Sequence, residues 1–192
     1  TFSVGVQPNA IRTRLGVEPQ AGIELGRFVL RDDVEANGET WFLRRAFAAL
    51  RLELPEVRGV LSYSDPMARS TADGRLVTPG HVGTIYQAFN GRHVGRTDAK
   101  WLHLAPDGSI LSERSLSKIR NDERGAAAYY EHLRGLGAPK MADGEDGRAW
   151  LARALAEGPF VRVRHPGNLA YVWRFDRMPA TLPRLPYPKA QG

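Results

Sequence analysis

The fold of this chain is decided by Val60-Leu61-Ser62-Tyr63-Ser64-Asp65-Pro66, a short apolar strand that runs into polar residues and a proline. Proline has no amide hydrogen for a strand ladder, so the strand stops before Pro66. Tyr63, Ser64 and Asp65 therefore lie at its carboxyl end. Ligands bind at that end of the strands in open α/β sheets, which makes these three residues candidates for a functional site. An ordinary turn explains them too, because Asp and Ser readily bond nearby backbone groups.

A second strand and a helix are predicted upstream. Residues 22–30 read as a strand after a polar loop, and apolar residues recur at helical spacing from Trp41 to Leu50 until Pro55 ends the helix. Strand, helix and strand in this order indicate a right-handed parallel crossover, with the start of the helix at the end of the first strand. The helix is expected to be buried, and free backbone amides at its start can hold an anion.

Arg27 interrupts the first of these strands among apolar residues. Arginine is seldom buried without a partner. We therefore expect Arg27 either to direct an anion-pairing group into a cleft or to form a structural salt bridge with an acid such as Asp65.

Further elements follow downstream. We predict a polar loop over residues 67–80 and a short helix from Val82 to Phe89 that carries Tyr86. The remaining predictions are strands at 101–104 and 110–111, helices starting near Ser112, Asn121 and Asp146, and a hairpin of 160–164 with 169–173 around His165-Pro166-Gly167-Asn168. We expect residues 1–177 to form one domain and residues 178–192 a Pro-rich extended tail.

Composition excludes several classes of protein. With 192 residues, of which 42% are hydrophobic, the chain can bury a sizeable core of α/β or α+β type. It has no cysteine, so disulfides and thiolate metal sites are excluded, while His and carboxylate metal sites stay open. There is neither a long apolar run nor a signal pattern, so we expect a cytoplasmic protein without a membrane segment. The standard nucleotide-binding and hydrolase motifs are absent.

The net charge of +6 is concentrated in residues 148–189, which hold eight basic and two acidic side chains. Only four of the 27 basic residues are lysine, and the arginine fork suits phosphate oxygens and guanine edges. We therefore predict a nucleic acid partner. The expected DNA contacts are Arg162, Arg164 and Arg174 on the hairpin, and Lys118 and Arg120 on a helix. A solvated surface and a GC-rich genome explain the same charges.

Three segments resemble the Mom-like DNA modification proteins of Mu-type phages: Glu24–Leu30, Ser62–Pro66 and Gly83–Asn90. The similarity extends over about residues 20–125. It implies an α/β fold like that of the GNAT acetyltransferases, a mixed sheet flanked by helices, whose first strand and helices would precede Phe2. Because the chain begins at Thr1 rather than Met, we expect that part, with a His-Tyr segment resembling a functional part of the family, to lie outside this chain.

The resemblance also implies an activity and a partner. Mom-like proteins convert adenine in double-stranded DNA to its N6-carbamoylmethyl form, which blocks restriction nucleases. On this template Asp65 would accept the N6 proton or orient the base edge, and Tyr86 resembles the position from which acetyltransferases protonate a leaving thiolate. Arg27 and Thr40 would hold the donor or a developing oxyanion. The implied base-recognition residues are Tyr63, Ser64, His81 and Asn90.

The implied cofactor is acetyl-CoA or a related acyl donor, bound at Gly38 and Thr40. Acetyltransferases hold the pyrophosphate with Arg/Gln-x-x-Gly-x-Gly/Ala, of which residues 33–40 keep only Gly38. The added group also contains an amide nitrogen that acetyl transfer does not supply. A further cofactor, a metal ion included, therefore stays open, and we assign no metal ligands.

Two other classes of function stay open. One is a non-catalytic DNA-binding or phage structural protein on the same scaffold, and the other is an ordinary N-acetyltransferase for a small amine or a protein. The oligomeric state is open as well, a dimer included.

Overall fold

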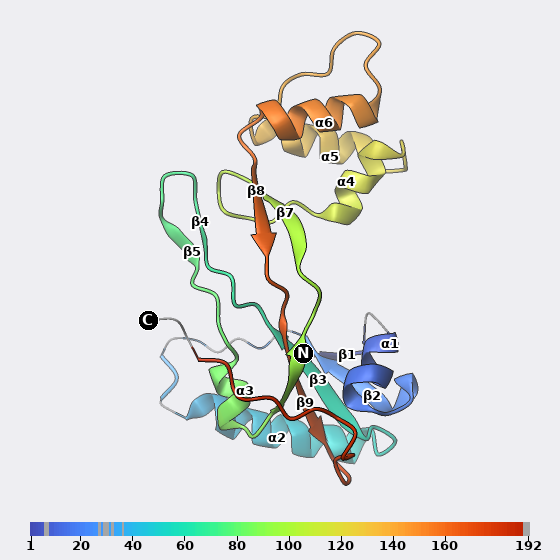
Figure 1. The fold of residues 1–192 in the computed structure, drawn as a ribbon, viewed down its shortest axis with the longest axis vertical. Helices are drawn as coiled ribbons and strands as arrows, with labels where there is room; N and C mark the ends of the chain where they lie inside the picture. The colour runs from blue at the N-terminus through green and yellow to red at the C-terminus, as the bar shows by residue number, and fades with distance from the viewer. Residues whose placement is uncertain (6–7, 27, 29–30, 32, 36, 190–192) are drawn as a thin grey trace. The chain divides into compact units, whose positions relative to one another are not determined.

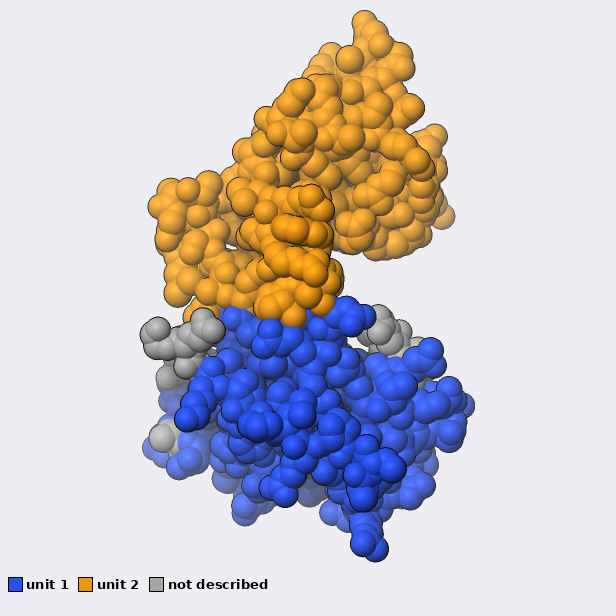
Figure 2. Space-filling model, viewed as in Figure 1, with its two compact units in different colours: residues 1–66, 80–98, 167–192 blue, residues 67–79, 99–166 orange. Residues whose placement is uncertain are grey.

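The computed structural model describes residues 1–5, 8–26, 28, 31, 33–35 and 37–189. Figure 2 colours two compact units. Unit 1 consists of residues 1–66, 80–98 and 167–192, and unit 2 of residues 67–79 and 99–166. The division into one domain and a tail stays a prediction. Among the described residues, no helix is long and apolar enough to cross a membrane.

Unit 1 is built on a five-stranded mixed sheet, in agreement with the predicted α/β class (Figure 1). In sheet order its strands are β1 (Phe2–Ser3), β2 (Gly22–Leu25), β3 (Gly59–Ser64), β9 (Leu169–Arg174) and β6 (Arg92–Arg96). β2 and β3 are parallel, and the other neighbours are antiparallel. Helix α2 (Gly38–Glu53) connects β2 to β3, which confirms the predicted strand, helix and parallel strand. The more specific acetyltransferase-like topology stays a prediction.

Of the two parallel strands, β3 ends where we predicted and β2 ends earlier than predicted. β3 ends at Ser64, directly before Asp65, as predicted. β2 ends at Leu25 rather than at residue 30, and the next amide, that of Gly26, bonds to the Thr1 carbonyl oxygen at 3.1 Å. Because the pairing of β2 with β3 stops at Leu25 and Ser62, β3 continues for two residues past its neighbour.

One face of the sheet packs against α2, whose buried side chains are Leu43, Phe47 and Leu50. The Phe47 ring makes edge contacts with four other aromatic rings, among them Trp173 at 5.4 Å between centroids. The expectation of a fully buried helix is wrong at its start, because Trp41 is 57% exposed and carries the Arg45 guanidinium over its ring at 3.6 Å. The buried stripe therefore begins at Leu43.

The opposite face of the sheet is covered by short turns that sequence reasoning missed. They are α1 (Pro8–Ala10), the π-helix η1 (Ile11–Leu15) and the 3-10 helix η2 (Pro19–Ala21). Ile11 and Leu15 are buried with Leu61 and Val172. Gly22 makes this approach feasible, because a Cβ atom there would lie 2.4 Å from Cγ2 of Ile11. The segment read as a polar loop thus provides a second core.

The predicted hairpin of residues 160–173 is wrong. β8 (Val161–His165) pairs with β7 (Lys100–Leu104) in unit 2, whereas β9 lies between β3 and β6 in unit 1. The apolar run Leu169–Trp173 is buried on both sides at the centre of a sheet, which a two-stranded hairpin cannot provide. Long-range burial therefore outweighs the local Pro-Gly turn signal.

Unit 2 also contains a hairpin and three helices. The hairpin of β4 (Arg69–Ser70) and β5 (Leu76–Thr78) lies where we expected a loop. The helices are α4 (Glu113–Arg120), α5 (Ala126–Gly135) and α6 (Gly147–Glu157). The predicted starts of α4 and α6 are confirmed, whereas α5 begins five residues after the predicted start near Asn121. Ser112 and Asp146 cap α4 and α6 by accepting backbone amides, and an isolated bridge joins Ile110 to Leu104 where a short strand was predicted. The core of this unit centres on Trp150.

Candidate functional site

A small pocket lies where the two parallel strands of unit 1 end. Its volume is about 160 Å³, and it is lined by Gly26, Phe28, Tyr63, His81, Gly83, Ile85 and Tyr86. Gly26 follows β2, Tyr63 lies near the end of β3, and Tyr86 lies on α3 (Thr84–Ala88). α3 is the helix predicted over residues 82–89, and it is shorter than predicted. The position matches the expected binding edge of the sheet.

Tyr86 is the most enclosed polar residue of this pocket. It is buried, and its phenol is hydrogen bonded to the Ser62 side chain, whose hydroxyl donates to the Leu25 carbonyl oxygen at 2.8 Å. Burial raises the pKa of the Tyr86 phenol, and the bond to Ser62 offsets part of that increase. Tyr86 therefore keeps its proton at neutral pH and can donate it.

His81 lies beside Asp65. The His81 amide donates to the Asp65 backbone carbonyl oxygen at 2.7 Å, and the two rings of His81 and Tyr86 meet edge to face at 6.3 Å. Desolvation lowers the pKa of the His81 imidazole, and the Asp65 carboxylate counteracts this by raising it. His81 is therefore neutral at pH 7 and able to accept a proton, with a carboxylate nearby to stabilise the protonated ring.

Behind the pocket, Tyr171 of β9 supports α3. Its hydroxyl donates to the Val82 carbonyl oxygen and accepts from Gln87 Nε2 at 3.1 Å. Gly83 has a positive φ of 75°, and a Cβ atom there would lie 2.6 Å from the Tyr171 ring. Gly83 thus permits the close approach that places Tyr86 over the sheet.

Ser62 and Ser64 belong to the same face of β3, because side chains two residues apart on a strand share a face. Ser64 is fully buried, and its hydroxyl has no hydrogen-bond partner among the described residues. Tyr63 borders the pocket, but its ring packs with the Ile11 cluster on the opposite face. Sequence reasoning missed Ser62, although its spacing of two from Ser64 was a usable signal.

Other predicted site residues lie elsewhere. The Thr40 hydroxyl donates to the Asn37 carbonyl oxygen at 3.0 Å, and the Gly38 amide bonds to the Glu35 carbonyl oxygen at 3.0 Å. Neither lines the pocket. Asn90 lines a different, larger pocket of unit 1. Arg27 lies outside the described residues, so its role stays a prediction.

A basic face is present on the two-stranded sheet of unit 2. β7 and β8 place Trp101 opposite Arg164 and His103 opposite Arg162, all on one face. The guanidiniums of Arg162 and Arg164 lie 4.3 and 5.5 Å from the Trp101 ring centroid, and Trp101 is 51% exposed. These contacts are cation–π interactions of roughly 0.5–1 kcal/mol each at an exposed site. We call Trp101, Arg162 and Arg164 the ribbon face.

The other predicted DNA contacts do not belong to the ribbon face. Arg174 is in unit 1, where it donates to the Leu15 and Gly16 carbonyl oxygens and pairs with Asp176 at 2.6 Å. Its side chain is 4% exposed, so it is not placed to contact a phosphate. Arg120 on α4 pairs with Glu113 at 3.2 Å, and Lys118 lies on the same helix.

The described residues of the pocket do not fit an acyl-CoA donor. The volume of about 160 Å³ is below the range of about 300–1,000 Å³ for sites of drug-sized ligands, and no arginine or lysine is among the lining residues to pair with a pyrophosphate. The acyl donor therefore stays a prediction without support from this pocket. Within the described part of the chain, no group of three or more His, Asp or Glu side chains could hold a metal ion.

Fold and site together define a mixed α/β protein whose small polar pocket lies at the carboxyl ends of two adjacent parallel strands. A family model gives the particular family. The chain belongs to the Mom protein family, whose model matches residues 1–140, and this confirms the resemblance seen in the sequence.

A curated relative supports the same assignment. The methylcarbamoylase Mom of Escherichia phage Mu is 28% identical to the chain over 126 residues, which are 65% of this chain and 47% of the relative. The chain therefore spans about half the length of the curated relative that it matches.

Proposed function

We propose that this chain takes part in DNA modification by adding a group of the carbamoylmethyl type to N6 of adenine. The observation that carries the proposal is the pocket with His81 and Tyr86 beside Asp65 in a member of the Mom protein family. The name of the phage Mu relative, a methylcarbamoylase, supports the type of group. Protection of phage DNA from host restriction would follow from the changed N6.

The chemistry needs a base and an acid. The N6 amine is a poor nucleophile because its lone pair is delocalised into the purine ring, so a base must take its proton as the new N6–C bond forms. Neutral His81 accepts that proton, and the Asp65 carboxylate stabilises the resulting imidazolium. Tyr86, which keeps its proton, donates to the leaving group of the donor. This assigns to His81 the proton transfer that the sequence suggested for Asp65.

The size of the pocket supports entry of a base edge rather than a whole cofactor. Phe28 and Ile85 add apolar surface to the pocket wall, against which the ring of a base can pack. Adenine in duplex DNA must leave the stack to reach such a pocket, at a cost of a few kcal/mol. Ser64 is fully buried and is not among the residues that line the pocket, so its contact with a base stays a prediction from the sequence.

Binding of double-stranded DNA is assigned to the ribbon face. Arg162 and Arg164 lie on an exposed aromatic ring, and among the residues that the structure describes neither forms an ion pair with a carboxylate. Their forks are therefore available to phosphate oxygens, which suits a substrate bound mainly through its backbone.

Nucleoside mass spectrometry tests the proposal. DNA from cells that express the chain should contain a modified adenine and should resist restriction nucleases that cut unmodified DNA. Unmodified nucleosides at full expression of folded protein would contradict it.

A second candidate function is DNA binding without catalysis, favoured by the ribbon face alone. Tight, salt-dependent binding to duplex DNA with no modified nucleoside would favour this candidate. An ordinary N-acetyltransferase would instead need an acyl-CoA site, which the described pocket residues do not supply.

A further inference from the structure

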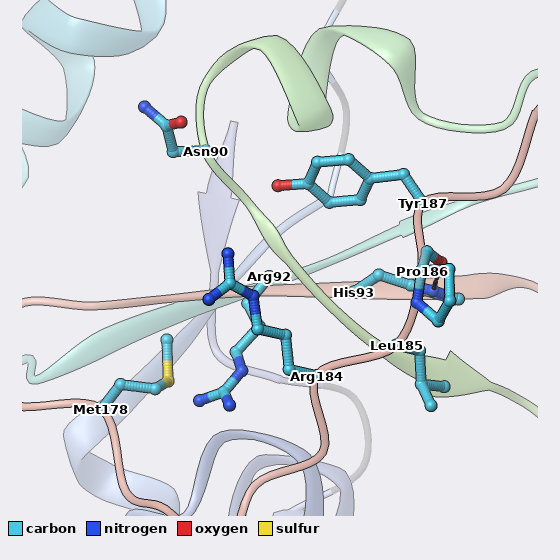
Figure 3. Close-up of a pocket in the computed structure, with 8 residues that line it drawn as sticks. All are labelled: Asn90, Arg92, His93, Met178, Arg184, Leu185, Pro186 and Tyr187. Carbon is cyan, nitrogen blue, oxygen red and sulfur yellow. Dashed lines mark hydrogen bonds between the residues drawn. The ribbon is translucent and has the colours of Figure 1, made fainter.

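Unit 1 contains a second, larger pocket between β6 and the carboxyl-terminal tail. Its volume is about 500 Å³, within the range of about 300–1,000 Å³ for small-molecule sites. Figure 3 shows the side chains that line it: Asn90, Arg92, His93, Met178, Arg184, Leu185, Pro186 and Tyr187. The proposed modification chemistry uses none of these residues.

Two arginines give this pocket a positive character. Figure 3 shows the guanidiniums of Arg92 and Arg184 turned toward the same side, in the space between Asn90 and Met178. No Asp or Glu is among the lining residues, and within the described part of the chain neither arginine forms an ion pair. Two like charges that share a pocket without a counter-ion favour the entry of an anion.

Arg92 supplies a second, independent observation. Its Nε atom is buried and has no hydrogen-bond partner among the described residues, and its Nη1 makes a long bond of 3.5 Å to the Pro179 carbonyl oxygen. A buried donor on a charged group costs free energy when it is left unsatisfied. An oxyanion in the pocket would pair with the Nη atoms of the same guanidinium, because no described acceptor offsets its charge at the buried Nε.

Hydrogen bonds to β6 fix the position of the tail, so the pocket has a defined lining. The Leu185 amide donates to the His93 carbonyl oxygen at 3.0 Å, and the buried His93 ring lies 2.9 Å from the Pro186 carbonyl oxygen through Nδ1. Gln87 Nε2 donates to the Pro188 carbonyl oxygen at 3.1 Å. These bonds position Arg184 and Tyr187 on the side of the pocket opposite β6.

We propose that this pocket binds a phosphate group. A phosphate has enough terminal oxygens to pair with both arginine forks, and the Tyr187 hydroxyl and the Asn90 amide supply further donors at the rim. The phosphate can come from a free phosphate monoester or from the DNA backbone.

Calorimetric titration of the whole chain tests this with inorganic phosphate, adenosine 5′-monophosphate and adenosine. We expect both phosphate probes to bind and adenosine not to bind. Arg184→Gln, which changes an exposed residue, should weaken binding of both phosphate probes at least tenfold, and Arg92→Gln should do so as well. The control is Arg124→Gln with Arg148→Gln, an exposed pair in unit 2, which should leave the affinity unchanged.

Three results would overturn the proposal: no binding of either phosphate probe, equal affinity for adenosine and its monophosphate, or the same loss of affinity in the control pair. Competition with a short duplex DNA identifies the source of the phosphate. If the duplex displaces adenosine 5′-monophosphate, the site binds the DNA backbone. If the duplex does not displace it, the site binds a free phosphate ester. The titrations do not measure adenine modification, so failure of the proposed function would leave their outcome unaffected.

Discussion

Tyr86 is the residue on which the proposed chemistry depends most directly, because it is the buried proton donor of the pocket. Tyr86→Phe keeps the ring that packs against Trp173 but removes the hydroxyl. We expect adenine modification to fall by about 100-fold with the fold intact, as when a positioned proton-transfer group is lost. Nucleoside mass spectrometry measures the modification of adenine, and circular dichroism shows whether the variant is folded.

The control for Tyr86 is Tyr130→Phe, which also removes the hydroxyl of a partly buried tyrosine, but one that packs in the core of unit 2 and does not line the pocket. It should keep wild-type modification. If Tyr86→Phe modifies DNA as well as Tyr130→Phe does, the role assigned to Tyr86 is wrong.

The pair of His81 and Asp65 makes a prediction about pH. A base works when it is neutral, so modification should decrease only as the pH falls through the His81 pKa, which desolvation holds below its usual 6.5. Asp65 raises that pKa, so Asp65→Asn should move the acid limb of the rate toward lower pH while it reduces the maximal rate. The measurement is the rate of modification from pH 5 to pH 8.

His81→Gln removes the titrating group and should abolish this acid limb, with a residual rate lower by about 100-fold. An acid limb that stays at the same pH in both variants would show that another group is the base.

At the scale of elements, α2 is held mainly by Phe47, whose ring contacts aromatic side chains from the strands and from α3's end. Phe47→Ala should lower the free energy of unfolding by about 3–5 kcal/mol, because it removes buried apolar surface and leaves a cavity. Trp41→Ala on the same helix changes an exposed side chain and should cost under about 1 kcal/mol. Urea denaturation compares the two, and equal losses would contradict the assigned core.

The helices were predictable because their signals are local. Apolar spacing and caps such as Ser112 and Asp146 act within one or two turns of the chain, and the structure has α4 and α6 start after these residues. The strand that ends before Pro66 is local in the same way. The turns at residues 8–21 were missed because a π-helix and a 3-10 helix have no strong repeat of their own, and burial of Ile11 and Leu15 under the sheet stabilises them.

At the scale of the whole molecule, the basic residues have different roles. Arg162 and Arg164 form part of the exposed ribbon face, whereas Arg174 is buried in unit 1. Arg162→Gln with Arg164→Gln should flatten the dependence of duplex binding on salt by about two units of the log-log slope, since each lost phosphate contact removes about 0.9. Sequence preference should not change, because phosphate contacts do not read bases. DNA titrations at several salt concentrations measure the slope.

The matched control for the ribbon face is again Arg124→Gln with Arg148→Gln, which removes the same charge from exposed positions of unit 2. An equal effect of both pairs would mean that net charge, and not the ribbon face, determines binding. Arg174 is excluded from the test because it bonds to the backbone at Leu15 and Gly16, so its loss would disturb the fold.

The sequence by itself determined the α/β class, the parallel pair around α2, the candidate edge at Tyr63 to Asp65 and the membership of the Mom protein family. Each of these depends on patterns within a short segment or on the order of a few segments. Hydrophobic spacing, caps and a proline stop operate between near neighbours, so the printed order of residues contains them.

Only the tertiary structure decided which distant residues meet. It placed β9 at the centre of a sheet instead of in a hairpin, and it brought His81 and Tyr86, without Asn90, to the ends of β2 and β3. It also buried Arg174 within unit 1 and placed Arg92 and Arg184 in one pocket. These outcomes depend on long-range burial and on hydrogen bonds between segments far apart in the chain. The free energy of these long-range contacts outweighs the local conformational preference of each segment. No pattern within a short segment of the sequence indicates which distant segments will make such contacts.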